Sequence, residues 1–346
     1  MAPLYGGNIV ESVRMLYLSG KDIANLGVGD MRLALEDVEE ALKLVYQKDV
    51  IIPEKIAMGF GKSIEEESVK GRINAMPCYL GGRFHIAGIK WIGSNPLNLE
   101  RGLPRASALT ILNDPETKFP LCVMNGADIS AIRTGASSGV AAKYLAKKNA
   151  ETILLIGAGL QNKMQLEAIY CARPSLKYFY VVDINREAAE RFAAEMGQKL
   201  GLTIVPLTDY SQCDRIPDVT VNATSAPVPV VPIEAAHAGN MHVCVGGLDH
   251  PELYQKADKI VCDSWHAVKH RPVCYMAQDA NAGRFDESRI YAEEIGQIIS
   301  GEKPGRTDDQ EFCYYKPVGM GVLDLAIAVR IYRKALEEKV GTWLEY

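Results

Sequence analysis

Five short apolar runs in the middle of the chain constrain its fold most strongly. Residues 152–156 (TILLI) and 178–182 (YFYVV) are each followed by a stretch with helical spacing of apolar residues, and further runs lie at 219–224, 241–245 and 259–263. Strands that alternate with amphipathic helices are typical of a parallel sheet with helices on both faces. We therefore expect an α/β fold with a doubly wound parallel sheet in this region.

The N-terminal part has a different pattern. A helix is expected from about Asp30, and the strand-like segments 85–93, 107–114 and 120–125 follow with little helix between them, which favours an antiparallel or mixed sheet. A helix near 129–145 leads into the β-α-β region, and a helix from about residue 320 returns to the first domain. The expected domains are 1–128 with 312–346 for substrate binding and dimerisation, and 129–311 for a dinucleotide. A cleft between them is a common place for a ligand.

Composition excludes several classes of protein. The chain has 346 residues and a formal net charge of -5, so it has no general attraction to nucleic acids or anionic lipids. No apolar run approaches about 18 residues, so no membrane span is expected. The N-terminus lacks a basic segment followed by an apolar stretch, and no two of the eight cysteines form a C-x-x-C pair. These features favour a cytoplasmic protein with reduced thiols.

A glycine-rich turn directly follows the run at 152–156. Its residues are Gly157, Ala158, Gly159, Leu160, Gln161 and Asn162, and they open a helix. Glycines let the backbone approach a pyrophosphate, whose charge a helix N-terminus favours, although Asn162 replaces the third glycine of the usual motif. Asp183 ends the next strand, where a carboxylate accepts hydrogen bonds from a ribose 2′-hydroxyl and so favours NAD over NADP. Arg186 weakens that preference, and a simple turn acid remains the alternative.

Basic residues before this turn suggest recognition of a carboxylate. Lys90 lies within an apolar strand, and Arg133 lies in the first turns of a helix, where a cation gains nothing from the helix dipole. Lys55 and Arg105 are further candidates, and solvated surface charges are the alternative for all four. His266 and His270 have helical spacing that would suit a metal ion, but no third ligand is evident, so packing of a helix face is preferred and no metal is expected.

Longer segments resemble a known family. These are GIKWIGSNPLNLERGLPRASALTILNDPETKFPLCVMNGADISAIRTGASSGVAAKYLA, ILLIGAGLQNKMQLEAI, EEIGQIISGEKPGR and YYKPVGMGVLDLAIA. In this order they are similar to the ornithine cyclodeaminase/mu-crystallin family over nearly the whole chain. The resemblance implies a Rossmann-type domain inserted in an α+β substrate and dimerisation domain built from both termini.

The resemblance also implies roles for individual residues. Lys90 and Arg133 match the residues that bind the substrate α-carboxylate, and Asp249 is the candidate catalytic general base. The matching cofactor positions are Thr134, Gly157, Gly159, Leu160, Gln161, Asp183, Ile184, Asn185, Asn222, Ala223, Thr224 and Ser225. The segment around Asp249 is shorter than is usual in the family. A first carboxylate-binding arginine is replaced by Lys55 or has moved to Arg72, near which Met76 is also expected at the substrate.

Arg105 points to one branch of the family. It occupies a position that is small or hydroxylic in ornithine cyclodeaminases, and the GIKWIGS, RASA and LNDPET segments are similar to the N-(2-amino-2-carboxyethyl)-L-glutamate dehydrogenases of siderophore precursor synthesis. A guanidinium there favours an acidic substrate. The expected protein is a homodimeric, NAD-dependent enzyme of amino-acid metabolism that acts on a CH–N bond through an imine. The alternatives are an ornithine or lysine cyclodeaminase, an imine reductase or alanine dehydrogenase, and a non-catalytic dinucleotide-binding protein like mu-crystallin.

Overall fold

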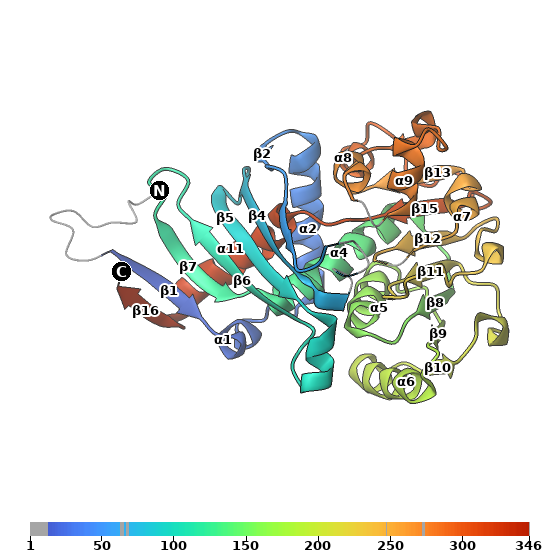
Figure 1. Ribbon diagram of the computed structural model, residues 1–346, viewed down its shortest axis with the longest axis horizontal. Helices are drawn as coiled ribbons and strands as arrows, with labels where there is room; N and C mark the ends of the chain where they lie inside the picture. Colours follow the sequence, from blue (N-terminus) through green and yellow to red (C-terminus); the bar gives the residue numbers. More distant parts are fainter. Residues whose placement is uncertain (1–12, 63–65, 67–68, 247, 272–273, 346) are drawn as a thin grey trace.

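The computed structural model describes residues 13–62, 66, 69–246, 248–271 and 274–345, so the N-terminal segment considered above lies largely outside the described residues. Two sheets form the centres of two bodies that lie side by side, and α4 (Ala127–Leu145) connects them (Figure 1). Among the described residues, no helix is both long and apolar enough to cross a membrane.

The first sheet is mixed, as the sequence pattern predicts. Its order is β16-β1-β7-β6-β5-β4-β2, with β3 also paired to β4, and only β1 and β7 run parallel. The strands are β1 (Arg14–Leu18), β2 (Val50–Ile51), β3 (Ile56–Gly59), β4 (Arg72–Leu80), β5 (Ile86–Ser94), β6 (Ala106–Asn113), β7 (Pro120–Asn125) and β16 (Thr342–Glu345).

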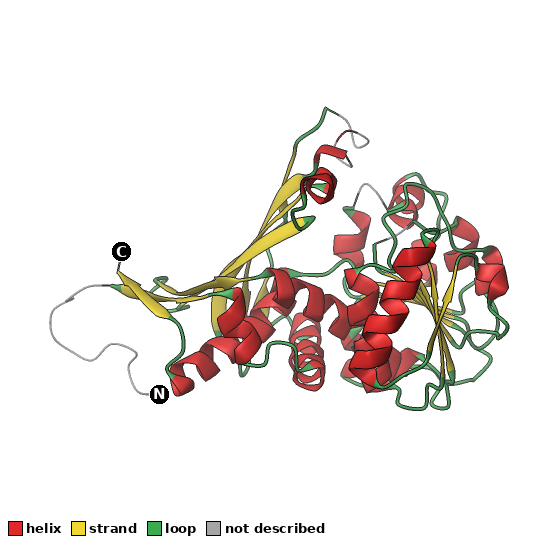
Figure 2. Cartoon of the chain, turned by 90° about the horizontal axis from the view of Figure 1, so that it is seen from below, coloured by secondary structure: helices red, strands yellow, loops and turns green. Residues whose placement is uncertain are grey.

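Helices cover one face of this sheet, and Figure 2 shows them below its strands. The helices that contact its strands are α1 (Gly20–Asn25), α11 (Gly321–Glu338) and α4, and α2 (Met31–Tyr46) packs on α4 and α11. A 3-10 helix η1 (Pro96–Arg101) joins β5 to β6. Asp30 caps α2 as expected, because its side chain accepts a hydrogen bond from the backbone N–H of Leu33. The return of α11 to the first sheet confirms the predicted packing of the C-terminal helix.

The second sheet is parallel throughout, which confirms the predicted doubly wound fold. Its order is β10-β9-β8-β11-β12-β15-β13-β14. The strands are β8 (Thr152–Ile156), β9 (Tyr178–Val182), β10 (Ile204–Leu207), β11 (Val219–Asn222), β12 (Met241–Cys244), β13 (Lys259–Cys262), β14 (Ile290–Ala292) and β15 (Cys313–Lys316).

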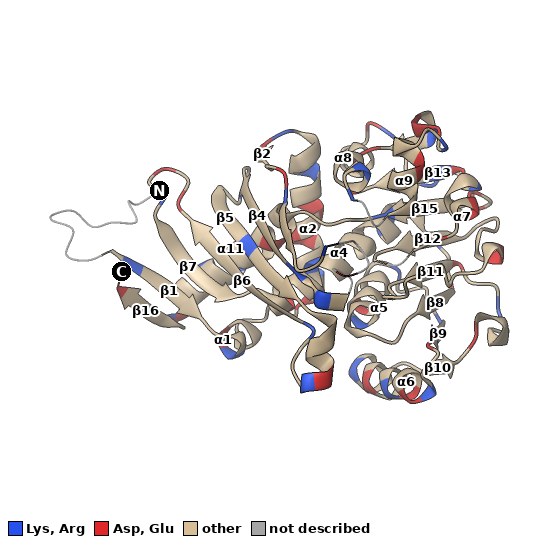
Figure 3. Cartoon of the chain, in the orientation of Figure 1, with Lys and Arg blue, Asp and Glu red and all other residues tan. Residues whose placement is uncertain are grey.

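The remaining helices surround this sheet. They are α5 (Leu160–Ala172), α6 (Arg186–Leu200), α7 (Pro251–Gln255), α8 (Trp265–Lys269), α9 (Tyr275–Asn281), α10 (Gly296–Ile299) and the 3-10 helices η2 (Tyr210–Gln212), η3 (Ile233–Ala235) and η4 (Glu287–Arg289). Charges of both signs alternate along α6 (Figure 3). All eight cysteines are free, as predicted.

One strand differs from the expected division at 311/312. β15 lies between β12 and β13, so the chain after residue 312 contributes to the second sheet before it returns to the first. The reason is topological, because a strand that inserts between two earlier strands is placed by long-range pairing and not by its local pattern.

Candidate functional site

The glycine-rich turn has the geometry of a dinucleotide loop. Gly157 has φ of 98°, which favours glycine, and a side chain there would meet Thr224. Gly159 has an ordinary φ, but no atom lies within 4 Å of where its Cβ would be, so the space beside it is open to a ligand. No side chain caps the N-terminus of α5, and its first N–H groups point toward that space. The chain therefore fits a bound pyrophosphate here.

Asn162, in the place of the third glycine, holds this turn. Its buried Nδ2 donates to the carbonyl oxygens of Ile156 at 2.8 Å and Gly157 at 2.6 Å. Asp183 also holds the turn, because its side chain accepts a hydrogen bond from the N–H of Ala158 at 2.8 Å. The loop thus keeps its shape through side-chain hydrogen bonds in addition to glycine.

The predicted ribose-binding end of β9 is open to solvent. Ile184 is 97% exposed, and Asn185 uses its side chain to cap α6 through the N–H of Ala188. Asp183 also accepts from the N–H of Asn185 at 2.9 Å. The carboxylate is therefore fixed in place at the strand end while its surroundings remain accessible.

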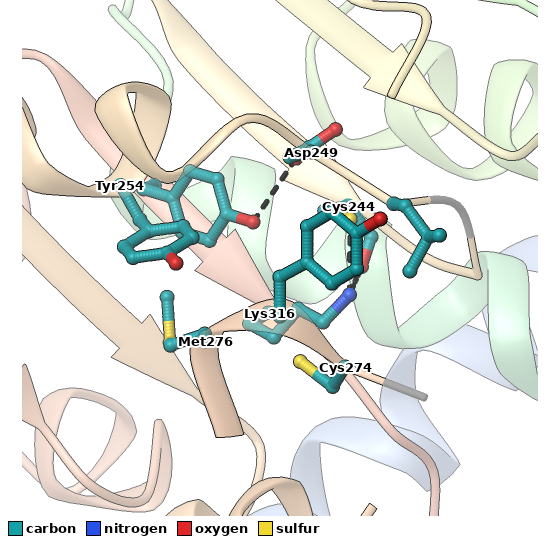
Figure 4. A pocket seen from close by; sticks show the side chains of 9 residues that line it. Cys244, Asp249, Tyr254, Cys274, Met276 and Lys316 are labelled. Carbon is teal, nitrogen blue, oxygen red and sulfur yellow. Dashed lines mark hydrogen bonds between the residues drawn. The ribbon is translucent and has the colours of Figure 1, made fainter. Parts of the chain in front are cut away.

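Asp249 lies in a buried network behind the end of β11. Its Oδ1 accepts from Asn222 Nδ2 at 2.7 Å, and its Oδ2 lies 2.8 Å from His242 Nε2 and accepts from the Tyr314 hydroxyl at 3.0 Å. Figure 4 shows Asp249 at the edge of a small cavity of about 10 Å³ that Lys316 and other side chains line. That volume is about the room that one water molecule needs.

This network keeps Asp249 ionised. Burial alone would raise the pKa of its carboxyl, but His242, Lys316 and Asn222 outweigh burial and hold the pKa below its ordinary value. Only 3% of the residue is exposed. Asn222 in turn accepts from the N–H and hydroxyl of Thr224, so the ionised carboxylate fixes the segment 222–225 beside the dinucleotide loop.

Lys90 and Arg133 meet at a buried carboxylate that the sequence analysis did not select. Lys90 Nζ lies 3.0 Å from Asp324 Oδ1, and Arg133 Nε lies 3.1 Å from Asp324 Oδ2. Asp324 is fully buried, and neither contact has the alignment of a hydrogen bond. Lys90 instead donates to Ser130 Oγ at 2.6 Å. Burial and the charge of Arg133 lower the pKa of Lys90 to about 8, although Asp324 opposes the shift.

Strand register places other predicted substrate residues beside Lys90. Met76 is its cross-strand partner, and Ile56, the residue after Lys55, pairs with Ala75. Burial of the amine and the charges of Arg271, Arg72 and Arg133 lower the pKa of Lys55 to about 8, while the residue as a whole stays accessible to solvent. Lys55, directly before β3, thus lies in line with Met76 of β4 and Lys90 of β5, and Arg72 lies near its amine.

A cavity of about 130 Å³ lies at the carboxyl ends of β12 and β15. Its lining residues are Arg133, Thr134, Ser137, Val245, Arg271, Pro317, Val318 and Gly319. The carbonyl oxygen of Thr134 accepts a hydrogen bond from Gln165 of α5 at 3.1 Å. This bond connects the cavity wall to α5, the helix that directly follows the dinucleotide loop. Ligands of open α/β sheets bind at this end of the strands.

Some residues differ from expectation in their position or were missed. Arg105 is exposed in the loop between η1 and β6 and does not line this cavity. Arg271, which does line it, gave no sequence signal because it lies in a loop among other basic residues. Asp324 could have been found, since an acid within the apolar helix segment 322–329 is as costly as Lys90 in its strand.

The structure also supplies the third metal-ligand candidate that the sequence analysis lacked. Glu54, His266 and His270 each offer one ligand atom within 4.8 Å of the others. All three are exposed, and Lys55 and Arg271 are the chain neighbours of Glu54 and His270. Adjacent cations oppose a further positive charge, so this group does not carry a metal site.

Known proteins match the chain over most of its length. The model of the ornithine cyclodeaminase/mu-crystallin family matches residues 28–339. The N-((2S)-2-amino-2-carboxyethyl)-L-glutamate dehydrogenase of Staphylococcus aureus is 33% identical over 95% of this chain and 98% of its own. The alanine dehydrogenase of Archaeoglobus fulgidus is 34% identical over 90% of this chain and 93% of its own.

A solved structure agrees with these matches. The Δ1-pyrroline-2-carboxylate reductase of Thermococcus litoralis, in complex with NADH and L-proline, has a TM-score of 0.86 and 34% identity and covers 95% of this chain and 99% of its own. An archaeal alanine dehydrogenase dimer with bound NAD has a TM-score of 0.85 and 31% identity, over 96% of this chain and 100% of its own.

Proposed function

Because the chain belongs to the ornithine cyclodeaminase/mu-crystallin family, we propose that it is an NAD-dependent oxidoreductase that acts at the CH–N bond of an α-amino acid. One observation carries this proposal. Arg133 and Thr134, which are successive residues of α4, line the cavity, and Thr134 is hydrogen-bonded to the helix that begins at the dinucleotide loop. A carboxylate held by Arg133 therefore lies beside the cofactor position.

The residues of the chain orient the substrate for hydride transfer. Arg133, with Lys90 behind it, binds the α-carboxylate and so fixes the direction of the Cα–H bond. Gly157, Gly159 and Asp183 would hold NAD, which would supply the acceptor for a hydride from Cα. Loss of that hydride would let the nitrogen lone pair form a C=N bond, and one proton would leave the nitrogen. Water then hydrolyses the imine to a keto acid and an amine.

Two groups are candidates for handling the amine proton. Lys90 has a pKa lowered to about 8, so a fraction of it is neutral near pH 8 and able to accept a proton. Asp249 remains the family's candidate base, but its oxygens face Asn222, His242 and Tyr314. In this arrangement Asp249 positions Asn222, and the Lys90 amine in turn contacts Ser130 and Asp324, so the two groups stay equal candidates for this role.

Two finer points belong to the same proposal. The candidate substrate is N-(2-amino-2-carboxyethyl)-L-glutamate, which the Staphylococcus aureus relative is named for and whose carboxylates suit a positively charged cavity. The enzyme is a cytoplasmic homodimer, which is supported by the relative solved as a dimer and by the exposed face of the first sheet, where Trp91 and Leu109 are cross-strand partners.

The test follows absorbance at 340 nm after mixing the protein with NAD and single amino acids. The panel contains N-(2-amino-2-carboxyethyl)-L-glutamate, L-alanine, L-proline, L-ornithine and L-lysine, and ammonia is measured in parallel. We expect net NADH growth with the first compound. Ammonia release from ornithine without NADH growth would instead identify a cyclodeaminase, and tight NAD binding without any turnover would identify a binding protein.

A further inference from the structure

The charges at the cavity are not balanced. Lys90 and Arg133 share the single carboxylate of Asp324, so these three buried groups have a net charge of about +1 when both cations are protonated. One substrate α-carboxylate offsets that charge. The buried Asp263 also interacts with Arg133, so a further cation at the cavity points to another anion only where it has no partner of its own in the described chain.

Arg271 is such a further cation. It lines the same cavity as Arg133, which lies in α4, but comes from the loop two residues after α8. Its backbone is held at both ends, because its N–H donates to Val268 O at 3.0 Å and its carbonyl accepts from Cys274 N at 3.0 Å. Among the residues that the structure describes, no side chain or carbonyl is hydrogen-bonded or ion-paired to its guanidinium. The guanidinium is therefore available to a ligand.

Lys55 lies near Arg271, because its chain neighbour Glu54 lies close to His270, the chain neighbour of Arg271. Burial lowers the pKa of its amine, and the charges of Arg271, Arg72 and Arg133 lower it further. No described carboxylate pairs with Lys55 either. Cations held this close repel one another, and an anion placed among them would relieve that repulsion.

Two of the nearby carboxylates in the described part of the chain, Glu287 and Asp263, have other partners, and Glu54 lies close to the rings of His266 and His270. Glu287 accepts from Lys269 and Trp265. Asp263 accepts from the N–H groups of Ser264, Val318 and Gly319.

We propose that Arg271, with Lys55 nearby, forms a second carboxylate subsite in the cavity that Arg133 also lines. The substrate class is accordingly an α-amino acid that carries at least one additional carboxylate. Calling the ligand a substrate rests on the proposed function, but the binding of an anion at this subsite does not. Arginine suits the role because it binds a carboxylate through two parallel hydrogen bonds.

The experiment compares two acids of equal carbon number, glutarate and pentanoate, as ligands of the NADH-bound protein. Isothermal titration gives their affinities for the wild type and for Arg271→Gln, Arg271→Lys and Lys55→Gln. We expect glutarate to bind at least about tenfold more tightly than pentanoate. Arg271→Gln should weaken glutarate about 10- to 100-fold, as loss of a charged hydrogen bond implies, and leave pentanoate nearly unchanged. Arg271→Lys should restore part of the loss.

A matched control removes a distant arginine. Arg191→Gln changes an exposed side chain of α6 and should leave both affinities unchanged. The subsite is rejected if the wild type binds both acids equally, or if Arg271→Gln weakens both by the same factor, which a purely structural role would do. Lys55→Gln provides a second variant if Arg271→Gln does not fold.

Kinetics separate this inference from the proposed function. For an active enzyme, Arg271→Gln should raise KM for N-(2-amino-2-carboxyethyl)-L-glutamate more than KM for the analogue in which the glutamate side-chain carboxylate is an amide. Oxidation of alanine without any preference for glutarate would retain the function and reject the subsite. Glutarate binding that depends on Arg271, without turnover of any amino acid, would retain the subsite and reject the function.

Discussion

At the scale of single residues, the buried carboxylate of Asp324 balances the site. We expect Asp324→Asn to destabilise the protein by about 3–5 kcal/mol, because it leaves Lys90 and Arg133 buried without their counter-charge. Chemical denaturation measures this change. The double variant with Lys90→Met should lose less stability than the sum of the two single variants, since the residues interact directly. Additive losses would show that the ion pair contributes little.

The two lysines predict a pH dependence of ligand binding. Burial, with the neighbouring arginines, lowers the pKa of both Lys90 and Lys55 to about 8, and only a protonated lysine attracts a carboxylate. Affinity for glutarate, which does not itself titrate in this range, should therefore be full below pH 7 and decline as pH rises through 8. Lys55→Arg keeps its charge and should make the decline shallower. If the affinity for glutarate stayed constant up to pH 9.5, it would contradict these pKa values.

Sequence reasoning at this scale singled out residues whose type conflicts with their surroundings, and the family resemblance then favoured a ligand-binding role over a surface role. Lys90 in an apolar strand and Arg133 near a helix N-terminus were selected in this way, and both contact Asp324. Asp324 gives the same signal in an apolar helix. Arg271 gives none, because a charge in a loop is normally solvated, and only the packing of α4 against the segments that follow β12, α8 and β15 brings it to the cavity.

At the scale of elements, close contact between α4 and α5 positions the site. A Cβ on Gly135 would lie 2.5 Å from the carbonyl oxygen of Met164, so the two helix backbones approach through a glycine. Because α4 carries Arg133 and α5 begins at the dinucleotide loop, we expect Gly135→Ala to cost about 1–3 kcal/mol of stability and to raise KM for NAD. Gly29→Ala, with no atom within 4 Å, is the control. If Gly135→Ala left both the stability and the KM for NAD unchanged, the two helices would be able to move apart by a methyl group without cost.

Strands are predictable one at a time, but their order is less so. The run at 178–182 matches β9, because an apolar β-branched segment bounded by polar residues is recognisable locally. β15 was assigned to the other domain, since its place between β12 and β13 depends on residues more than 50 positions away. That misplacement matters for function, because Pro317, Val318 and Gly319 follow β15 directly and line the cavity.

At the scale of the whole molecule, the described helices that pack on the first sheet lie on one of its faces (Figure 2), and large apolar side chains lie on the opposite face. Trp91 is 44% exposed, its cross-strand partner Leu109 is 42% exposed, and Ile56 extends the same row. The neighbouring residue Lys90 is buried, because successive side chains of a strand point to opposite faces. Exposed apolar patches of this kind mark association surfaces.

We therefore expect Trp91→Glu to convert a homodimer into a monomer. In a two-fold symmetric interface the substitution places a charge in both copies, and each would be buried without a partner. Light scattering after size exclusion should give twice the 37.9 kDa chain mass for the wild type and the single chain mass for the variant. Ile216→Glu, at a residue 77% exposed in the other body, should remain dimeric. A monomeric wild type would contradict the expected dimer. A Trp91→Glu variant that stays dimeric would show that the interface lies on another surface.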